Sequence, residues 1–244
     1  MSSPPLGKMQ IVKLLRRKHG LGAFLEISTP ITGAQFAEMA GENPDPHRLV
    51  YNCPNDADDG QAYTYRTDAP TSSKLIQAIL AANQNRPYYD IMFVDPFHTY
   101  ACSSTDLSGA FALLRPGGIM VVHDCNPADA AIASPEPVSD TWCGLTYMAF
   151  IDFALRHNGL SFYTVETDYG CGVIYKHPVR LPMASRRKET LDHFAFAWDM
   201  VRHNTATRFA FFAQCRRELL NLKSVEEFFA LEGLPRAAPA MSEG

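Results

Sequence analysis

Short apolar runs recur along the chain, and segments with a different hydrophobic spacing separate them. Several runs are apolar at nearly every position and rich in β-branched or aromatic residues, which is typical of strands buried on both faces. The runs are AFLEI (23–27), RLVYNC (48–53), AYTYR (62–66), YDIMFVD (89–95) and GIMVVHD (118–124). They predict strands of a sheet that is covered on both sides.

The intervening segments place hydrophobic residues three and four positions apart and therefore predict helices. They are 35–40, 72–83 and 105–114, and a further helical pattern lies at 145–156. For the third segment, Ser103, Ser104 and Thr105 are candidate N-caps, and Pro-Gly-Gly ends the helix. Alternation of strand and helix in steps of about thirty residues predicts right-handed crossovers, and hence a parallel sheet with helices on both faces.

The C-terminal part of the chain departs from this alternation. The runs LSFYTVETD (160–168) and GCGVIYK (170–176) are too close for a crossover, so they predict an antiparallel hairpin at the edge of the sheet. Beyond Pro178 the chain is mostly helical and dense in aromatic residues, which favours packing onto the core or onto a second copy in a homodimer. We expect four regions, namely an N-terminal helical segment (1–19), an α/β domain (20–178), a C-terminal helical extension (179–235) and a flexible tail (236–244).

Composition narrows the class of protein. The chain has 244 residues, of which 46% are hydrophobic and 20% charged, which suits a globular domain with a full core. The formal net charge of −4 predicts no nucleic-acid partner, and the lack of a run of eighteen apolar residues predicts no membrane span. Six cysteines without a C-x-x-C pair argue against a zinc knuckle and suit a reducing compartment. Because the start lacks an apolar signal core, we expect a cytoplasmic protein.

Polar residues follow the predicted strands at the points where they end. In an open parallel sheet all carboxyl ends face one rim, where ligands bind. The residues at these ends are Glu26, Ser28, Thr29, Asn52, Asp68, Asp95, His98, His123 and Asp124. Some have a simpler interpretation, because Asp68 can cap the next helix and Asp95, before Pro96, can form a turn. Two strand ends that each offer an Asp and a His nevertheless favour a binding crevice.

One long segment carries a resemblance. Residues 88–127, YYDIMFVDPFHTYACSSTDLSGAFALLRPGGIMVVHDCNP, resemble the fourth and fifth strand region of class I S-adenosylmethionine-dependent methyltransferases, which often reads I-D-G-x-H-x-Y, a helix, L-x-P-G-G and a strand ending in His-Asp. The similarity is greatest to a bacterial group with HDCNP, a later Trp-containing helix start such as WCGLTYMAF, a strand such as DYGCGVIY and a C-terminal RRELLNLKSVEEFF. It implies a Rossmann-like, doubly wound sheet of seven strands, mostly parallel with the last strand antiparallel, which agrees with the pattern above.

The resemblance also implies where S-adenosylmethionine binds. The implied cofactor-binding residues are Glu26, Ile27, Ser28, Gly33, Asn52, Asp68 and Asp95. Two of them depart from the family. Ser28 stands where a glycine usually lets the backbone approach the ligand, and Asn52 stands where an acidic residue usually accepts the ribose hydroxyls. A catalytically silent relative that binds or assembles is therefore the alternative to an enzyme.

For an enzyme, the resemblance implies O-methylation of a small hydroxylated metabolite or sugar. Such a transfer needs alignment and a base, for which His98 is the first candidate and His123 the second. Similar enzymes hold a divalent ion at the positions of Asp95 and Asp124, but only these two carboxylates match, so Mg²⁺ stays an alternative. A nicotinamide-dependent dehydrogenase lacks support, because no G-x-G-x-x-G follows the first strand.

Overall fold

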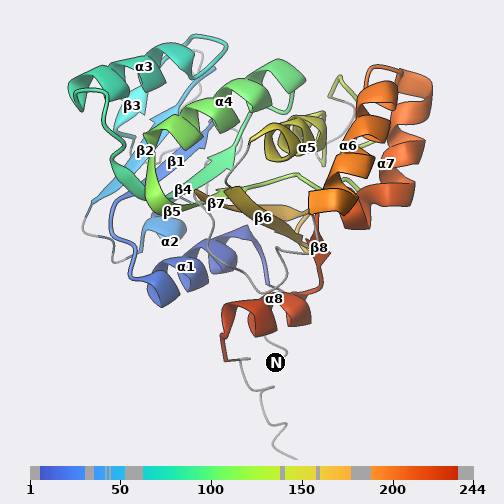
Figure 1. The fold of residues 1–244 in the computed structure, drawn as a ribbon. Coiled ribbons are helices and arrows are strands. Elements are labelled where there is room, and N and C mark those ends of the chain that lie inside the picture. Colours follow the sequence, from blue (N-terminus) through green and yellow to red (C-terminus); the bar gives the residue numbers. More distant parts are fainter. Residues whose placement is uncertain are drawn as a thin grey trace, which may run out of the picture.

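A mostly parallel sheet forms the centre of the molecule (Figure 1). The computed structural model describes residues 6–30, 36–41, 43, 45–52, 63–137, 141–157, 160–176 and 188–235, the side chains of 188–192 excepted. Within these residues the sheet has eight strands in the order β3-β2-β1-β4-β5-β7-β6-β8. The strands are β1 (Phe24–Ser28), β2 (Pro46–Val50), β3 (Tyr65–Arg66), β4 (Tyr89–Asp95), β5 (Leu114–Val122), β6 (Leu160–Val165), β7 (Cys171–Lys176) and β8 (Leu222–Lys223).

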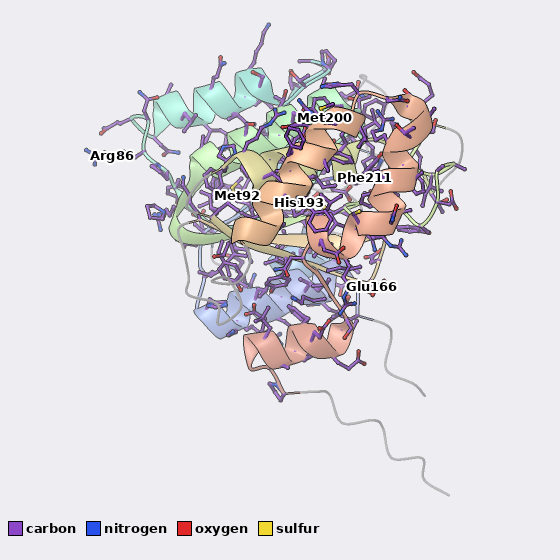
Figure 2. The ribbon with its side chains drawn as sticks, turned by 45° about the vertical axis from the view of Figure 1, so that its right-hand side comes forward. Arg86, Met92, Glu166, His193, Met200 and Phe211 are labelled. Atoms are coloured by element: carbon purple, nitrogen blue, oxygen red, sulfur yellow. The ribbon has the colours of Figure 1, made fainter. Side chains whose placement is uncertain are left out.

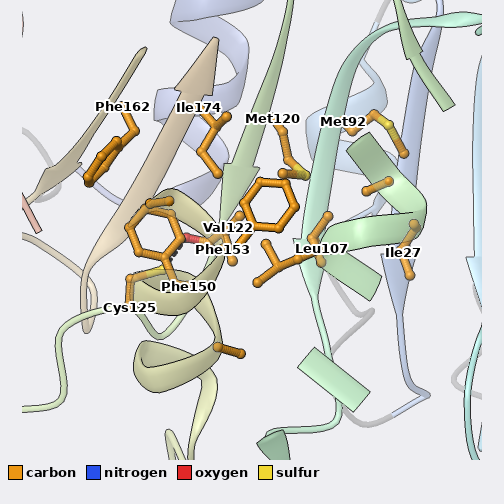
Figure 3. Packing of buried hydrophobic residues seen from close by; sticks show 14 of the residues in the cluster. Ile27, Met92, Leu107, Met120, Val122, Cys125, Phe150, Phe153, Phe162 and Ile174 are labelled. Atoms are coloured by element: carbon orange, nitrogen blue, oxygen red, sulfur yellow. Dashed lines mark hydrogen bonds between the residues drawn. The ribbon is translucent and has the colours of Figure 1, made fainter. Parts of the chain in front are cut away.

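Helices cover both faces of the sheet. The helices are α1 (Lys8–His19), α2 (Phe36–Ala40), α3 (Ser73–Ala82), α4 (Tyr100–Leu113), α5 (Thr146–Arg156), α6 (Lys188–Val201), α7 (Thr205–Leu219) and α8 (Val225–Glu232). Buried residues of α3, α4, α5 and α7 share one hydrophobic cluster with one face of the sheet, and those of α1, α2 and α8 share a second cluster with the other face (Figure 1). In Figure 3, Met120 and Val122 of β5 lie among Leu107, Phe150 and Phe153 of the first cluster.

The strand directions confirm the predicted Rossmann-like, doubly wound fold. Strands β1 to β5 pair in parallel, and β7 pairs antiparallel with both β5 and β6. The seven predicted strands are present, and the two-residue β8 adds an eighth beside β6. The predicted antiparallel hairpin exists and lies at one end of the sheet, where only the two-residue β8 is beyond it. Strand β7 lies between β5 and β6, which is consistent with the burial of its residues from Cys171 to Tyr175.

The start of α4 also differs from its prediction. The helix begins at Tyr100, and Thr99 is its cap, because the Thr99 side chain accepts from the backbone N–H of Cys102. The polar residues 103–106 do not interrupt the helix because two of them find partners inside the molecule. Ser103 Oγ lies 3.1 Å from Thr146 Oγ1 of α5, and Asp106 accepts from Ser72.

The C-terminal helices turn most of their aromatic residues inward. Trp198 of α6 is fully buried, and the ring of Phe212 of α7 lies 4.6 Å from that of Tyr147. Phe196 and Met200 of α6 are exceptions, being 72% and 71% exposed, and Met200 is labelled in Figure 2. A homodimer through the C-terminal extension stays a prediction.

The ends of the chain complete the second layer of helices. Residues Ile11, Val12 and Leu15 of α1 are fully buried, and Lys18 Nζ lies 2.7 Å from Glu232 Oε2 of α8. The division into four regions stays a prediction, and residues 236–244 lie outside the described residues. In the described part of the chain, none of the helices has the length and apolar character that crossing a membrane requires.

Candidate active site

The ends of β4 and β5 bring predicted site residues together. Asp95 is the last residue of β4, and His123 and Asp124 directly follow β5. The N–H of His123 donates to the carbonyl of Val94 at 3.0 Å, so the two strand ends stay paired up to the rim. Asp124 then adopts a positive φ of 59°, which turns the chain out of the sheet.

Two histidines share two carboxylates at this rim. His98 Nε2 lies 3.0 Å from Asp124 Oδ2 and 3.4 Å from Asp95 Oδ1. His123 Nδ1 lies 3.0 Å from Asp124 Oδ2 and 3.6 Å from Asp95 Oδ1. All four residues are buried. The structure therefore joins, in one contact network, four residues that the sequence places at two different strand ends.

Two further residues that sequence reasoning missed belong to the same network. Lys8, the first residue of α1, places Nζ 2.9 Å from Asp95 Oδ2 and 3.4 Å from His123 Nδ1. Asp168 accepts from the backbone N–H of Lys8 at 2.9 Å. Its Oδ1 also lies 3.3 Å from His123 Nε2, although this contact is not aligned well enough to be a hydrogen bond. We call the six residues the rim cluster: Lys8, Asp95, His98, His123, Asp124 and Asp168.

The sequence indicates the position of Asp168 in part, but not that of Lys8. Asp168 lies in the turn of the predicted hairpin, and the inward position of β7 carries that turn to the rim, where the N–H groups of Cys125 and Asn126 donate to the carbonyls of Gly170 and Tyr169. The sequence did not predict that β7 is the hairpin strand beside β5, and this order brings Asp168 to the rim. Lys8 carries no local signal, because only the docking of α1 on the sheet determines where its side chain ends.

Opposite charges within the rim cluster set its protonation. Burial raises the pKa of Asp95, but the charges of Lys8 and His123 outweigh burial and hold that pKa well below its usual range. His123 and His98 likewise lower the pKa of Asp124 against the effect of burial. Burial lowers the pKa of His98, yet hydrogen bonds and charges from Asp124 and Asp95 raise it to about 9. The pKa of His123 is raised well above its usual value by the same two carboxylates, again against burial.

A second buried ionic group lies in β1, two residues before the strand ends. Glu26 is fully buried, Ser28 Oγ donates to Glu26 Oε1 at 2.6 Å, and Arg48 Nε of β2 donates to the same oxygen at 3.3 Å. Burial raises the pKa of Glu26 to about 7, although Ser28 and Arg48 act in the opposite direction. Glu26 Oε2 is buried and has no hydrogen-bond partner among the described residues. This oxygen is therefore a ready acceptor for a donor from a ligand.

The other predicted cofactor residues differ from one another in burial and in position. Ile27 is fully buried in the first hydrophobic cluster, so only its backbone can contact a ligand at the rim. Asn52 follows β2 with a positive φ of 51° and is half-buried, and Asp68, after β3, is exposed. Gly33 lies outside the described residues. The structure thus places Asn52 and Asp68 after neighbouring parallel strands, at the same edge as Asp95.

Trp142 and Gly144 lie against His98. The ring of Trp142 lies 5.3 Å from that of His98, and its indole N–H donates to the carbonyl of Ser134 at 2.7 Å. Gly144 has a φ of +56°, and a Cβ at this position would lie 2.1 Å from the carbonyl oxygen of His98. Only glycine permits this approach. Tyr147, in the helix that follows, is fully buried and packs on Phe212.

The donor atoms for a divalent ion are present, but internal cations already engage them. Asp95, His98 and Asp124 each offer one ligand atom, and these atoms lie within 4.8 Å of one another. In the arrangement observed, the ammonium of Lys8 contacts Asp95 and the Nε2 of His98 contacts both carboxylates. A divalent ion does not fit the rim cluster while the Lys8 ammonium holds Asp95, because like charges repel in a buried site.

Comparison with known protein families finds a match to part of the chain. Residues 35–125 match the family model described as a methyltransferase domain. This part of the chain is similar to a methyltransferase domain. The matched segment includes the ends of β2 to β5 and four of the six residues of the rim cluster. Together with the fold, the match supports a methyltransferase that depends on S-adenosylmethionine. The narrower bacterial group suggested by HDCNP is not confirmed, and no curated protein matches the chain.

Several solved structures are similar to part of the chain. An O-methyltransferase from Bacillus cereus, in complex with SAH, is 16% identical, with a TM-score of 0.51 over 72% of this chain and 82% of that one. A candidate O-methyltransferase from Klebsiella pneumoniae is 20% identical, with a TM-score of 0.49 over 70% of this chain and 80% of that one. TomG from Streptomyces achromogenes, an O-methyltransferase involved in tomaymycin synthesis and in complex with SAM, is 15% identical, with a TM-score of 0.48 over the same shares. At these identities the likeness to the Bacillus cereus protein shows the methyltransferase fold alone.

Proposed function

We propose that this protein is an S-adenosylmethionine-dependent O-methyltransferase that acts on a small hydroxylated metabolite or sugar. The observation that carries the proposal is the buried pairing of two histidines with two strand-end carboxylates at the rim of a methyltransferase domain. An oxygen nucleophile needs a group that removes its proton, and an imidazole held by carboxylates is such a group.

The cofactor site of the proposal lies along the ends of β1, β2 and β3. S-adenosylmethionine supplies, when bound, a methyl group on a positively charged sulfur. The unpartnered Glu26 Oε2 would accept from the amino group of the cofactor, and Asn52 and Asp68 would face its ribose and base. Ser28, in turn, holds the first Glu26 oxygen by its hydroxyl hydrogen bond. Gly33 and the backbone of Ile27 complete the proposed set.

In the proposed reaction the neutral form of His98 removes the proton of the acceptor hydroxyl. Asp95 and Asp124 then stabilise the imidazolium that forms. An ordinary histidine side chain titrates at about pH 6.5, whereas the two carboxylates raise the pKa of His98 to about 9. His98 is thus mostly protonated at neutral pH, and its function as a base requires the minority neutral form. His123 is the second candidate, and its Nε2 lacks a hydrogen bond among the described residues.

A catalytically silent relative is the second candidate function. Two observations favour it, because Glu26 Oε1 is already bound by Arg48 and Ser28, and Asn52 offers no charge to a ribose. In this alternative the fold would bind a partner or ligand without turnover.

Calorimetry with S-adenosylmethionine and S-adenosylhomocysteine separates the two candidates. We expect saturable binding of both, and a loss of affinity in Glu26→Gln, which removes the buried negative charge at nearly constant volume. Absence of binding at about millimolar cofactor would leave only the silent alternative. If binding occurs, methyl transfer from labelled cofactor to a panel of sugars and hydroxylated metabolites then identifies the acceptor class.

A further inference from the structure

The positive charge nearest to Asp95 comes from α1, which lies outside the matched methyltransferase segment. Lys8 Nζ lies 2.9 Å from Asp95 Oδ2, and the side chains of Lys8 and Asp95 are only 13% and 1% exposed. The same nitrogen lies 3.4 Å from His123 Nδ1 and 5.9 Å from the centre of the Phe93 ring. A lysine in this position is a largely buried partner of the cluster and not an exposed surface group.

The position of Lys8 is fixed from both ends of its helix. Its backbone N–H donates to Asp168 Oδ2 at 2.9 Å. Gly7 precedes it, and a Cβ there would lie 3.2 Å from the same carboxylate oxygen, so the helix start packs closely on the hairpin turn. Further along, Lys18 contacts Glu232 at 2.7 Å. Because α1 is held at its first and last turns, its first turn delivers the ammonium to the carboxylates as part of the fold.

Lys8 and a divalent ion would use the same oxygens. Asp95, His98 and Asp124 hold their donor atoms within 4.8 Å of one another, as a metal site requires. A hard cation would bind carboxylate oxygen at about 2.0 to 2.6 Å. The ammonium contacts Asp95, so an ion bound to the same carboxylate would face an unscreened positive charge in a buried site.

We propose that Lys8 is a built-in cation that takes the place of a divalent metal ion in the rim cluster. The wild-type protein therefore excludes such ions from Asp95, His98 and Asp124, and removal of the Lys8 ammonium converts these residues into a divalent-cation site. The rim cluster is thus neutralised from within the chain, so the proposed methyl transfer proceeds without added metal.

The test is a titration of the full-length chain with Mn²⁺, in which the paramagnetic resonance signal of the free hydrated ion reports the amount bound. We expect the wild type to bind no ion at the rim up to about 1 mM. Lys8→Met should bind one Mn²⁺ per chain at least about tenfold more tightly than the wild type. Added Mg²⁺ should compete, and the double variant Lys8→Met/Asp95→Asn should lose the site.

Two further substitutions separate charge from other effects. Lys8→Arg keeps the positive charge and should still exclude Mn²⁺. Lys13→Met is the matched control on the same helix, since Lys13 Nζ lies 2.9 Å from Glu38 Oε1 in a much more exposed ion pair, and it should behave as the wild type. If Lys8→Met does not fold without ion, Lys8→Gln replaces it, and Mn²⁺ must raise the melting temperature of that variant more than that of the wild type.

Each contrary result overturns the proposal. Binding of one Mn²⁺ at the rim of the wild type would show that the ammonium does not exclude the ion. Equal binding by wild type and Lys8→Met would have the same meaning. Absence of Mn²⁺ binding in both Lys8→Met and Lys8→Gln would show that the carboxylates form no cation site. The readout does not use methyl transfer, so failure of the proposed enzymatic function leaves this test intact.

Discussion

His98 lies between two carboxylates, and this position determines the pH at which it can accept a proton. Its Nε2 contacts Asp124 at 3.0 Å and Asp95 at 3.4 Å, and both contacts stabilise the protonated ring. With the pKa of His98 raised to about 9, the fraction of neutral imidazole grows about tenfold per pH unit below that value. In this position less of His98 is neutral at pH 7, but the imidazolium that forms after proton transfer is stabilised.

We therefore predict that kcat/KM of the enzyme rises with pH and levels off near pH 9. His98→Ala should lower turnover by about 100-fold or more, because the base is lost, while the affinity for S-adenosylhomocysteine changes little. Initial rates from pH 6 to 10 and calorimetry on the variant check both statements. A pH profile that is flat above pH 7, or an unchanged rate in His98→Ala, would exclude His98 as the base.

Asp106 gives a prediction about stability at the residue scale. Burial raises its pKa from 3.8 to about 7, although hydrogen bonds from Ser72 and Tyr51 oppose the shift. Because the folded-state pKa lies above the unfolded value, the folded state binds more protons between these two values. The free energy of unfolding therefore decreases as pH rises through this window and is lowest above about pH 7.

The matching substitution is Asp106→Asn, which removes the titration at constant size. Between pH 5 and 8 the wild type should lose about 1–3 kcal/mol of unfolding free energy relative to the variant. Urea denaturation at the two pH values measures the difference. Asp199→Asn, at a side chain that is 59% exposed, serves as the control and should follow the wild type. Parallel pH curves for wild type and Asp106→Asn would contradict the prediction.

At the scale of the elements, the sequence predicted where the strands lie better than it predicted which elements lie beside them. The predicted run 89–95 coincides with β4, and the predicted end of β5 carries His123 and Asp124 to the rim, because buried parallel strands have continuous apolar patterns. The antiparallel hairpin was predicted because its loop is short, whereas the order of its strands, with β7 beside β5, depends on the whole sheet. Lys8 was missed for the same reason, since no pattern within α1 specifies which strand it covers.

Gly144, in the turn before α5, allows a prediction about the start of this helix. A Cβ on Gly144 would lie 2.1 Å from the carbonyl oxygen of His98, and its φ is +56°. Gly233, which ends α8, has nearly the same φ of +59°, but a Cβ there would meet nothing within 4 Å among the described residues. Both glycines need the left-handed conformation, and only Gly144 also needs the space.

We expect Gly233→Ala to cost about 1 kcal/mol of unfolding free energy, from the left-handed backbone alone. Gly144→Ala should cost roughly 2–4 kcal/mol and also displace His98, so that turnover falls as well. Denaturant melts of both variants give the comparison. Equal destabilisation of the two would show that the segment around Gly144 moves aside without consequence for His98.

At the scale of the whole molecule, α1 links α8, near the C-terminus, to the rim cluster. Its first turn supplies Lys8 to Asp95, and its last turn supplies Lys18 to Glu232 of α8. Glu232 is almost fully buried and also accepts from the hydroxyls of Tyr163 and Tyr175, at 2.7 and 2.8 Å. The C-terminal helix thereby holds the helix that completes the rim cluster, although it lies far from that cluster in sequence.

Replacement of Glu232 tests this connection. Glu232→Ala leaves two buried hydroxyls and an ammonium without their acceptor, so we expect a loss of about 3–5 kcal/mol of unfolding free energy and faster amide exchange throughout α1. Glu38→Gln is the control, because it breaks an exposed ion pair to the same helix and should cost at most about 1 kcal/mol. Hydrogen exchange read by mass spectrometry resolves α1 from the sheet. If α1 exchanged no faster in Glu232→Ala than in Glu38→Gln, the buried side chains Ile11, Val12 and Leu15 would suffice to hold the helix, and Lys8 would reach Asp95 without any contribution from α8.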